Sequence, residues 1–121
     1  MGKPRNKFEQ ALWNSLRRSG RAEYEPEYLS YTLQCMYLPD FTLKTKTGRK
    51  IYIEGKGKFD ATNRRKMAAV KQQHPDKDIR FVFYNAYAKI RKGSNTTCAD
   101  WANKNGFQWA HRSVPKSWMK E

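Results

Sequence analysis

The acidic residues Asp40 and Glu54, together with Lys56, are the side chains of this chain best spaced for chemistry. They lie in the stretch YLPDFTLKTKTGRKIYIEGKGK, whose glycine at position 48 suits a three-residue turn between two strands. A hairpin that turns at 46–48 sets Asp40 opposite Glu54, with their Cβ atoms about 5 Å apart, and sets Lys56 on the same face. Two like charges held so close need compensation. A divalent cation that prefers hard oxygen ligands, Mg²⁺ or Mn²⁺, would supply it.

The expected register gives this hairpin one apolar and one polar face. The predicted pairs are Thr45 with Arg49, Leu43 with Ile51, and Phe41 with Ile53. The apolar partners share one face, which leaves the other face for the carboxylates and the lysine. Beside a metal, Lys56 would orient a water molecule or offset charge on a phosphate. The alternative is a surface hairpin in which Glu54 pairs with Lys56 or Lys44 and no chemistry takes place.

The chain as a whole is strongly basic, with 25 Lys and Arg against 11 Asp and Glu and a formal charge of +14 over 121 residues. Such an excess attracts polyanions and favours a nucleic-acid partner. A basic membrane-surface protein would need a cationic amphipathic helix or a lipid anchor, and neither is evident. Without a long apolar run or a signal peptide, we expect a soluble intracellular protein that is not secreted and has no membrane partner. The basic residues expected to contact DNA are Lys3, Arg5, Lys7, Arg64, Arg65, Lys66, Lys89, Arg91 and Lys92.

The two cysteines and two histidines have weaker claims to function. Cys35 and Cys98 are isolated, so neither a zinc site nor a disulfide is expected, and both are interpreted as small core or boundary residues. His74 precedes a proline and His111 ends an expected strand, so both are interpreted as structural or surface residues rather than general bases.

The pattern along the chain predicts a mixed sheet flanked by helices, an α/β (α+β) fold. In the first half we expect a helix from Lys7 that ends before Ser19, one or two strands over 23–33, and the hairpin over 36–56. A helix capped by Asp60 should then run to about Gln73, followed by a central strand over 79–84 that is covered on both faces. The remaining elements are a short helix capped by Thr96 or Thr97 that stops at Gly106, a strand over 107–110 and a final turn over 115–118. We expect one domain over residues 1–121, with 1–6 as a flexible basic arm.

Glu9 is a third acid to consider, because it lies one position off the apolar stripe of the first helix. Spacing alone favours a solvated residue paired with Lys7 or Arg5. The alternative is a third carboxylate that joins the metal site or holds its water.

An acid on the first helix followed by P-D-x13-E-x-K matches the pattern of the PD-(D/E)xK nuclease superfamily. More narrowly, the chain resembles the phage endonuclease I family, whose members resolve four-way DNA junctions. The likeness runs from about Phe8 to Glu121. It is strongest in the segments YLPDF, IEGKG, QQHPDKDIRFVF, IRKGS and VPKSWMKE.

The resemblance implies a restriction-endonuclease-like core and phosphodiester hydrolysis that depends on Mg²⁺ or Mn²⁺. It also implies a homodimer with exchanged strands, in which each active site draws on both subunits. Carried over by motif, Asp40 and Glu54 would bind metal, Gly55 would lend its backbone carbonyl, and Lys56 would be the catalytic lysine. Glu9 would be a catalytic glutamate donated by the partner subunit. The chain departs from the family's better-known member by a longer hairpin loop and by glycine instead of threonine at position 55.

The expected function is therefore a structure-selective endodeoxyribonuclease that resolves four-way junctions and other branched DNA during recombination, working in the cytoplasm of a bacterial host. Because phosphate contacts carry no sequence information, its selectivity should follow DNA shape. One alternative is a non-catalytic basic module that binds DNA. Another keeps the chemistry but changes the substrate, as in a mismatch or flap nuclease.

Overall fold

The computed structural model describes residues 4–121, and the chain divides into two compact units, Met1–Cys35 and Met36–Glu121. Lys3, one of the basic residues expected to contact DNA, lies outside the described residues. The single domain expected over residues 1–121 stays a prediction.

The first unit is built around helix α1 (Lys7–Leu16), which continues into the 3-10 turn η1 (Arg17–Ser19). The side chain of Asn6 caps the helix by accepting the N–H of Glu9 at 2.8 Å. The chain leaves η1 through Gly20 at φ 72°, so the predicted helix and its end are both confirmed. No residue of α1 is buried, and the apolar stripe of Phe8, Leu12 and Leu16 is exposed.

The strands predicted over 23–33 are wrong for this chain taken alone. The backbone there has bends and irregular structure, and it joins no sheet among residues 4–121. The alternating apolar residues Leu29, Tyr31 and Leu33 do form a β pattern, but a strand exists only where a second strand satisfies its N–H and C=O groups. Their side chains are exposed.

The second unit holds a four-stranded mixed sheet, as the sequence predicted. Its strands are β1 (Phe41–Lys44), β2 (Lys50–Lys56), β3 (Asp78–Phe83) and β4 (Gln108–His111), in the spatial order β1-β2-β3-β4. β1 is antiparallel to β2, while β2, β3 and β4 are parallel to one another. A restriction-endonuclease-like core stays a prediction.

The hairpin has the predicted register. Phe41 pairs with Ile53 and Leu43 with Ile51, the N–H of Thr45 donates to the carbonyl of Arg49 at 2.7 Å, and Gly48 has φ 86°. The first strand is shorter than the hairpin expected over 36–56. It begins only at Phe41, because Pro39 has no N–H to donate and the side chain of Asp40 takes the N–H of Gly55.

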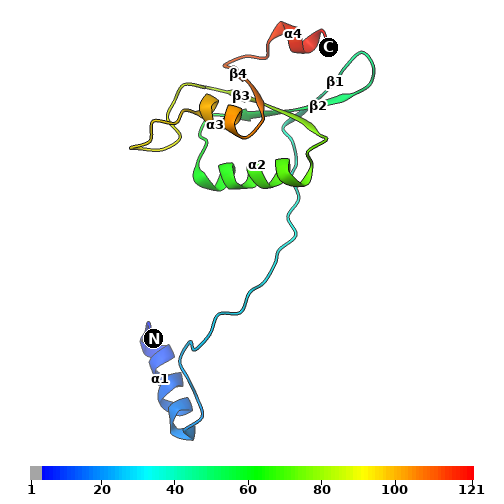
Figure 1. The fold of residues 1–121 in the computed structure, drawn as a ribbon. Coiled ribbons are helices and arrows are strands. Elements are labelled where there is room, and N and C mark those ends of the chain that lie inside the picture. Colours follow the sequence, from blue (N-terminus) through cyan, green and yellow to red (C-terminus); the bar gives the residue numbers. More distant parts are fainter. Residues whose placement is uncertain (1–3) are drawn as a thin grey trace. The chain divides into compact units, whose positions relative to one another are not determined.

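Helices cover both faces of the sheet (Figure 1). On one face α2 (Ala61–Gln73) and α3 (Cys98–Lys104) pack on Phe81 and Phe83, and on the other face α4 (Lys116–Met119) places Trp118 against Ile51 and Ile53. The caps predicted from sequence are present: Asp60 accepts from the N–H of Asn63, and Thr97 forms a reciprocal capping box with Asp100. The central strand β3 is thus covered on both faces, as expected.

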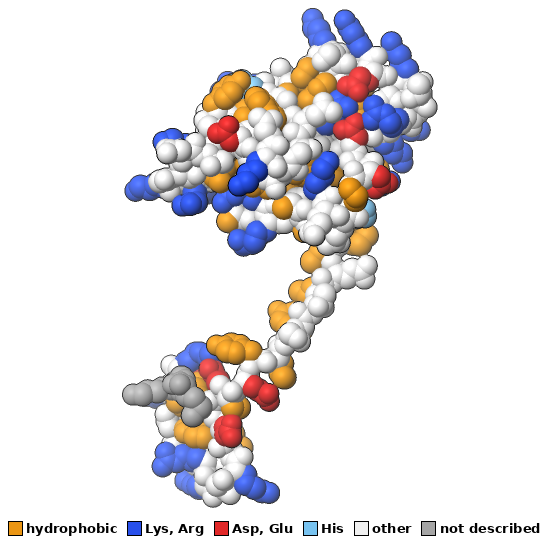
Figure 2. Space-filling view, viewed as in Figure 1, with side chains coloured by type: hydrophobic (Ala, Val, Ile, Leu, Met, Phe, Trp, Pro, Cys, Tyr) orange, Lys and Arg blue, Asp and Glu red, His pale blue; other side chains and the backbone are white. Residues whose placement is uncertain are grey.

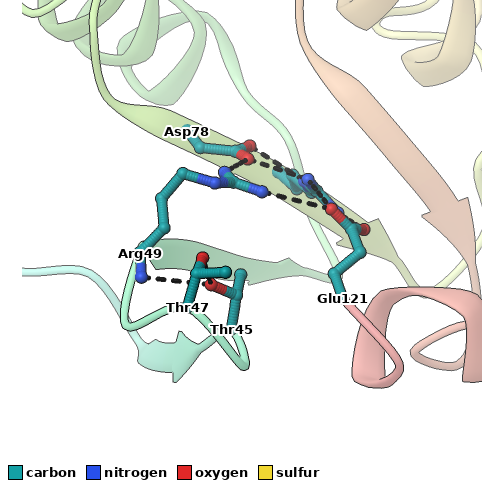
Figure 3. Close-up of polar contacts among 6 residues, drawn as sticks. Thr45, Thr47, Arg49, Asp78 and Glu121 are labelled. Atoms are coloured by element: carbon teal, nitrogen blue, oxygen red, sulfur yellow. Dashed lines mark hydrogen bonds and ion pairs between the residues drawn. The ribbon is translucent and has the colours of Figure 1, made fainter.

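A network of ion pairs joins the hairpin, the start of β3 and the last residue (Figure 3). The buried guanidinium of Arg80 binds Asp78 through two bonds of 2.8 Å and binds Glu121 at 2.6 and 3.0 Å. Arg49 reaches Asp78 at 2.7 Å and Glu121 at 3.3 Å. A charge buried inside a strand is tolerated when it is fully paired in this way.

The cysteines differ from one another. Cys98 is buried in the core, as expected, but Cys35 is exposed and is therefore not the core or boundary residue that the sequence suggested. Within residues 4–121, no helix combines the length and apolar character needed to cross a membrane.

Candidate active site

The candidate site lies at the carboxyl-terminal edge of the sheet, where the parallel strands β2, β3 and β4 all end. Glu54 and Lys56 belong to the last three residues of β2, and their partners on β3 are Phe81 and Phe83. Both side chains therefore lie on the face that α2 and α3 cover. Such an edge is where ligands bind in many sheets with parallel strands.

Glu54 is a buried carboxylate with a relative exposure of 5%, and both of its oxygens are engaged. The hydroxyl of Tyr37 donates to Oε1 at 2.7 Å, and the ammonium of Lys56 lies 3.0 Å from Oε2. Burial and the adjacent Glu54 carboxylate raise the pKa of Tyr37, so the hydroxyl stays a donor at neutral pH. The Glu54–Lys56 pair that the surface-hairpin alternative expected is present, but both side chains are largely shielded from solvent.

Lys56 has a second acceptor on helix α2. Its Nζ donates to Oδ1 of Asn63 at 3.3 Å, and the amide of Asn63 in turn donates to Oδ1 of Asp60 at 3.0 Å. The same Asp60 oxygen caps the helix through the N–H of Asn63. Because the cap fixes the amide, the ammonium of Lys56 lies between a carboxylate and a neutral oxygen whose position α2 determines.

Asp40, the residue that precedes the neighbouring strand β1, lies next to this pair. Continued by one step, the register of the hairpin sets Asp40 beside Glu54, and the N–H of Gly55 donates to Oδ2 of Asp40 at 3.0 Å. The structure therefore brings Asp40, Glu54, Gly55 and Lys56 to one place on the hairpin. Asp40 is exposed while Glu54 is buried, so the acids occupy the outer and inner parts of the cluster.

The donor set fits a hard divalent cation in its chemistry. Carboxylates such as Asp40, just before β1, and Glu54 on β2 are the ligands that Mg²⁺ and Mn²⁺ prefer, and a backbone carbonyl or water can complete the shell. Among residues 4–121, no three acidic, histidine or cysteine side chains gather closely enough to hold a metal without such help. The ammonium of Lys56 now neutralises Glu54, so a cation at Oε2 would have to replace that contact.

Glu9 belongs to the first unit, where its carboxylate has its own partners. Tyr24 donates to Oε1 at 3.1 Å, and the guanidinium of Arg5 lies 3.7 Å from the same oxygen. Arg5 is one of the two partners, Lys7 or Arg5, that spacing alone suggested. A role for Glu9 at the site on β2 stays a prediction.

Most of the basic residues expected to contact DNA are exposed, and Lys and Arg side chains project from several sides of the second unit (Figure 2). Arg64 is different, because its Nη1 donates to the carbonyls of Phe59 at 2.6 Å and Ile90 at 2.9 Å. It therefore ties the start of α2 to the loop before α3. Lys66 lies over the ring of Tyr37, 5.4 Å from its centroid.

Sequence reasoning missed Tyr37 and Asn63, which hold the two ends of the Glu54–Lys56 pair. The sequence signals for these two residues were weak. Tyr37 begins the YLPDF segment, and Asn63 lies three residues after the helix cap Asp60. His111 has a structural role, as expected, because its Nδ1 accepts the N–H of Ala86 at 3.2 Å.

A hollow of about 370 Å³ lies away from this cluster, at the other end of β2. It is lined by Gly48, Arg49, Lys50, Tyr52, Asp76, Lys77 and Asp78.

Comparison with known proteins identifies the family of the chain. The model of the family described as phage endonuclease I matches residues 2–121. The chain belongs to the phage endonuclease I family. Among its curated relatives, "Endonuclease I" of Escherichia phage T7 is 32% identical over an alignment of 125 residues with its gaps, which covers 100% of this chain and 81% of that protein. "Endodeoxyribonuclease 1" of Enterobacteria phage T3 is 38% identical over 86 residues, which cover 71% of this chain and 54% of that protein.

Membership of the phage endonuclease I family extends over both units, because the matched residues include α1 as well as the sheet. The segments YLPDF and IEGKG, which carried the resemblance, are the ones that build the cluster of Asp40, Glu54 and Lys56. The glycine at position 55 is compatible with this arrangement. A Cβ added there would meet only Oδ2 of Asp40, at an ordinary contact distance of 3.8 Å.

Proposed function

We propose that the protein is a divalent-metal-dependent endodeoxyribonuclease that resolves four-way DNA junctions and cuts other branched DNA. The observation that carries this proposal is the cluster of Asp40, Glu54 and Lys56 on one hairpin in a chain of net charge +14. Family membership supports nuclease chemistry, and the names of the relatives from phages T7 and T3 describe endonucleases.

Each residue of the cluster has a distinct task. Asp40 and Glu54 would hold Mg²⁺ or Mn²⁺ with the carbonyl of Gly55, and a cation bound there supplies Lewis acidity at the phosphate and acidifies a bound water. Tyr37 orients the carboxylate of Glu54 through Oε1. Lys56, released from Glu54 but still in contact with Asn63, places a positive charge where the attacking oxygen or the pentavalent phosphate becomes more negative.

A cleavage assay with a matched variant tests the chemistry. Wild type and Glu54→Gln are incubated with a synthetic four-way junction and Mg²⁺, and both are assayed for binding by gel shift. We expect both proteins to bind the junction and only wild type to cut it. Binding without cleavage by either protein would favour a non-catalytic DNA-binding module. A parallel comparison of junction, flap, mismatch and linear duplex then identifies the preferred substrate.

A strand-exchanged homodimer is supported by the apolar residues that the chain leaves exposed. These are Phe8, Leu12 and Leu16 on α1, and Tyr28, Leu29, Tyr31, Leu33, Met36, Leu38 and Phe41 from 28 to 41. The alternating residues at 29, 31 and 33 have the pattern of a strand, and within residues 4–121 they pair with no other strand. A second copy of the chain would satisfy both the apolar side chains and the backbone, and a two-fold assembly suits a junction that is nicked at two symmetric places.

Complementation between two inactive variants tests both the exchange and the role of Glu9. Glu9→Gln and Glu54→Gln are each expected to abolish cleavage as homodimers. If Glu9 acts in the partner's site, a mixed dimer contains one complete site and one site with both defects, so co-expression restores nicking. If Glu9 acts within its own chain, each site of the mixed dimer keeps one defect and nicking stays absent. A monomer in sedimentation equilibrium would reject the exchanged dimer outright.

A further inference from the structure

The carboxyl-terminal edge of the sheet carries a second group of exposed side chains beside the candidate site. Tyr84 directly follows β3, and its N–H donates to the carbonyl of Lys56 at 2.9 Å. Arg112 directly follows β4, and its N–H donates to the carbonyl of Phe83 at 2.7 Å. Since neighbouring strands lie about 4.8 Å apart, Tyr84 is one strand and Arg112 two strands away from the strand that holds Lys56.

Tyr84 and Arg112 form a stacked pair on the protein surface. The guanidinium carbon of Arg112 lies 4.4 Å from the ring centroid of Tyr84, and its Nε donates to the carbonyl of Tyr84 at 3.2 Å. Tyr84 is nevertheless 65% exposed, so much of its ring still faces solvent. An aromatic ring held by a guanidinium is a pre-organised surface for another planar group.

The backbone at Arg112 is strained in a way that maintains this pair. Its φ of 71° lies in the left-handed region, which residues other than glycine rarely adopt. Strain of this kind persists only where the surroundings enforce it, and it is concentrated at functional sites. Here the bond to the carbonyl of Phe83 fixes the turn, and the side chain returns over Tyr84.

A separate group of rings lies at the end of β4, on the face of the sheet that Phe81 and Phe83 share. Tyr87 is 62% exposed, and its ring centroid lies 4.9 Å from that of His111 and 6.0 Å from that of Trp109. We call the stacked pair of Tyr84 and Arg112 the edge surface. Exposed rings combined with an arginine are the means by which proteins hold unpaired bases without reading their sequence.

We propose that the edge surface binds a nucleobase that is unstacked at the branch point, with the base on the ring of Tyr84 and an adjacent phosphate on Arg112. The inference rests on the proposed function, because the catalytic strand beside Tyr84 defines which base is reached. A base within a linear duplex has neighbours on both faces and offers none to a ring. Selection of branched over linear DNA would therefore arise at the branch point.

An abasic scan tests this contact. Single abasic positions are placed at each of the three nucleotides on either side of the branch point of a synthetic four-way junction. Affinity is measured without metal in the Glu54→Gln background, so that no cleavage occurs. We expect one position whose missing base weakens binding about tenfold, in line with the loss of one stacked base. Tyr84→Leu in the same background should bind the intact junction about tenfold more weakly and should lose this dependence on the base.

Two matched variants separate the roles of the pair. Tyr84→Phe keeps the ring and should keep the abasic dependence. Arg112→Gln should weaken binding and lower its salt dependence, whereas Lys77→Gln, at the opposite end of β3, should not change the abasic dependence. Circular-dichroism melts confirm that each variant is folded.

The outcomes distinguish this inference from the proposed function. An abasic dependence that is identical with and without Tyr84→Leu in the Glu54→Gln background, or that is absent while the junction is still bound, overturns the edge surface and leaves the nuclease in place. A coupled abasic dependence in a protein whose wild type cuts no branched DNA supports the edge surface and rejects the nuclease. Failure of the wild-type chain to bind the junction rejects both.

Discussion

The hydroxyl of Tyr37 lies 2.7 Å from Oε1 of Glu54, and Tyr37 precedes Asp40 and strand β1 in the chain. The bond accounts for one oxygen of a buried charge, and Lys56 accounts for the other. A carboxylate held at both oxygens cannot rotate freely. The direction in which Glu54 presents Oε2 is therefore set before any cation arrives.

Removal of this hydroxyl should cost stability and metal affinity together. Tyr37→Phe leaves Oε1 of a buried carboxylate without a donor, which should lower the free energy of unfolding by about 1–3 kcal/mol. Mn²⁺ affinity, measured by titration calorimetry without DNA, should fall because Glu54 is no longer oriented. Tyr52→Phe is the matched control, since Tyr52 is also a half-buried tyrosine. Among residues 4–121, it is Tyr37 and not Tyr52 that donates a hydrogen bond to Glu54. Equal stability of Tyr37→Phe and wild type would contradict the bond.

Replacement of Lys56 should separate its structural task from its catalytic one. In the protein without metal, Lys56→Met leaves Glu54 buried and unpaired, which should cost roughly 3–5 kcal/mol of stability. Added Mn²⁺ should raise the melting temperature of the variant more than that of wild type, because no ammonium competes for Oε2. Lys58→Met, two residues further on and exposed, should change neither quantity.

The catalytic role predicted for Lys56 is tested by measuring junction binding and cleavage. Lys56→Ala should retain junction affinity within a few-fold of wild type, since one phosphate contact among many is lost. Its turnover should be abolished, because the charge beside the reacting phosphate is gone. Lost affinity with retained cleavage would refute this role.

The ion-pair network at the other end of the sheet should make the protein sensitive to acid. Burial raises the pKa of Asp78, but hydrogen bonds from Arg80 and Arg49 outweigh it and hold that pKa below its usual 3.8. The bond from Arg80 likewise holds the pKa of Glu121 below 4.5. A carboxylate whose pKa is lower in the folded state stabilises the fold above its unfolded pKa. Urea midpoints should therefore be constant near neutral pH and fall once the pH drops below about 4.5.

A substitution in the network identifies the source of that acid sensitivity. Asp78→Asn should cost about 2 kcal/mol at pH 7, less than the roughly 3–5 kcal/mol typical of a fully buried pair because its carboxylate keeps some contact with solvent. Its urea midpoint should depend less on pH below 4.5 than that of wild type. Asp76→Asn, at an exposed position two residues earlier, should leave the profile unchanged. A profile of Asp78→Asn that parallels wild type would place the sensitivity elsewhere.

The features that sequence predicted are those that short stretches of chain determine. The turn at Gly48, the register of the hairpin and the cap at Asp60 each depend on residues within one or two turns, and all are present. The contact of Tyr37 with Glu54 spans 17 residues, and that of Arg80 with Glu121 spans 41 residues. No local pattern encodes such contacts, because they exist only once the sheet has formed.

The strands expected over 23–33 illustrate a different limit. Alternation identifies a segment that can become a strand, but the partner strand decides whether it does. That partner is not among the strands of the described sheet. If a second copy of the chain supplied a strand that pairs with residues 29–33, this segment could form the strand that its alternating pattern predicts.

Gly55 offers a test of how much flexibility the site requires. Glycine inside a strand costs stability, and a Cβ at this position meets only Oδ2 of Asp40 at 3.8 Å, so Gly55→Ala should raise the free energy of unfolding by roughly 0.5–1 kcal/mol. The carbonyl that would face the metal is unchanged, so cleavage should persist. Gly48→Ala is the informative control: nothing lies within 4 Å of its Cβ, yet its φ of 86° makes alanine unfavourable, and the variant should lose stability. A stabilised Gly55→Ala that no longer cuts DNA would mean that the hairpin must deform at residue 55 during the reaction, rather than merely present its carbonyl.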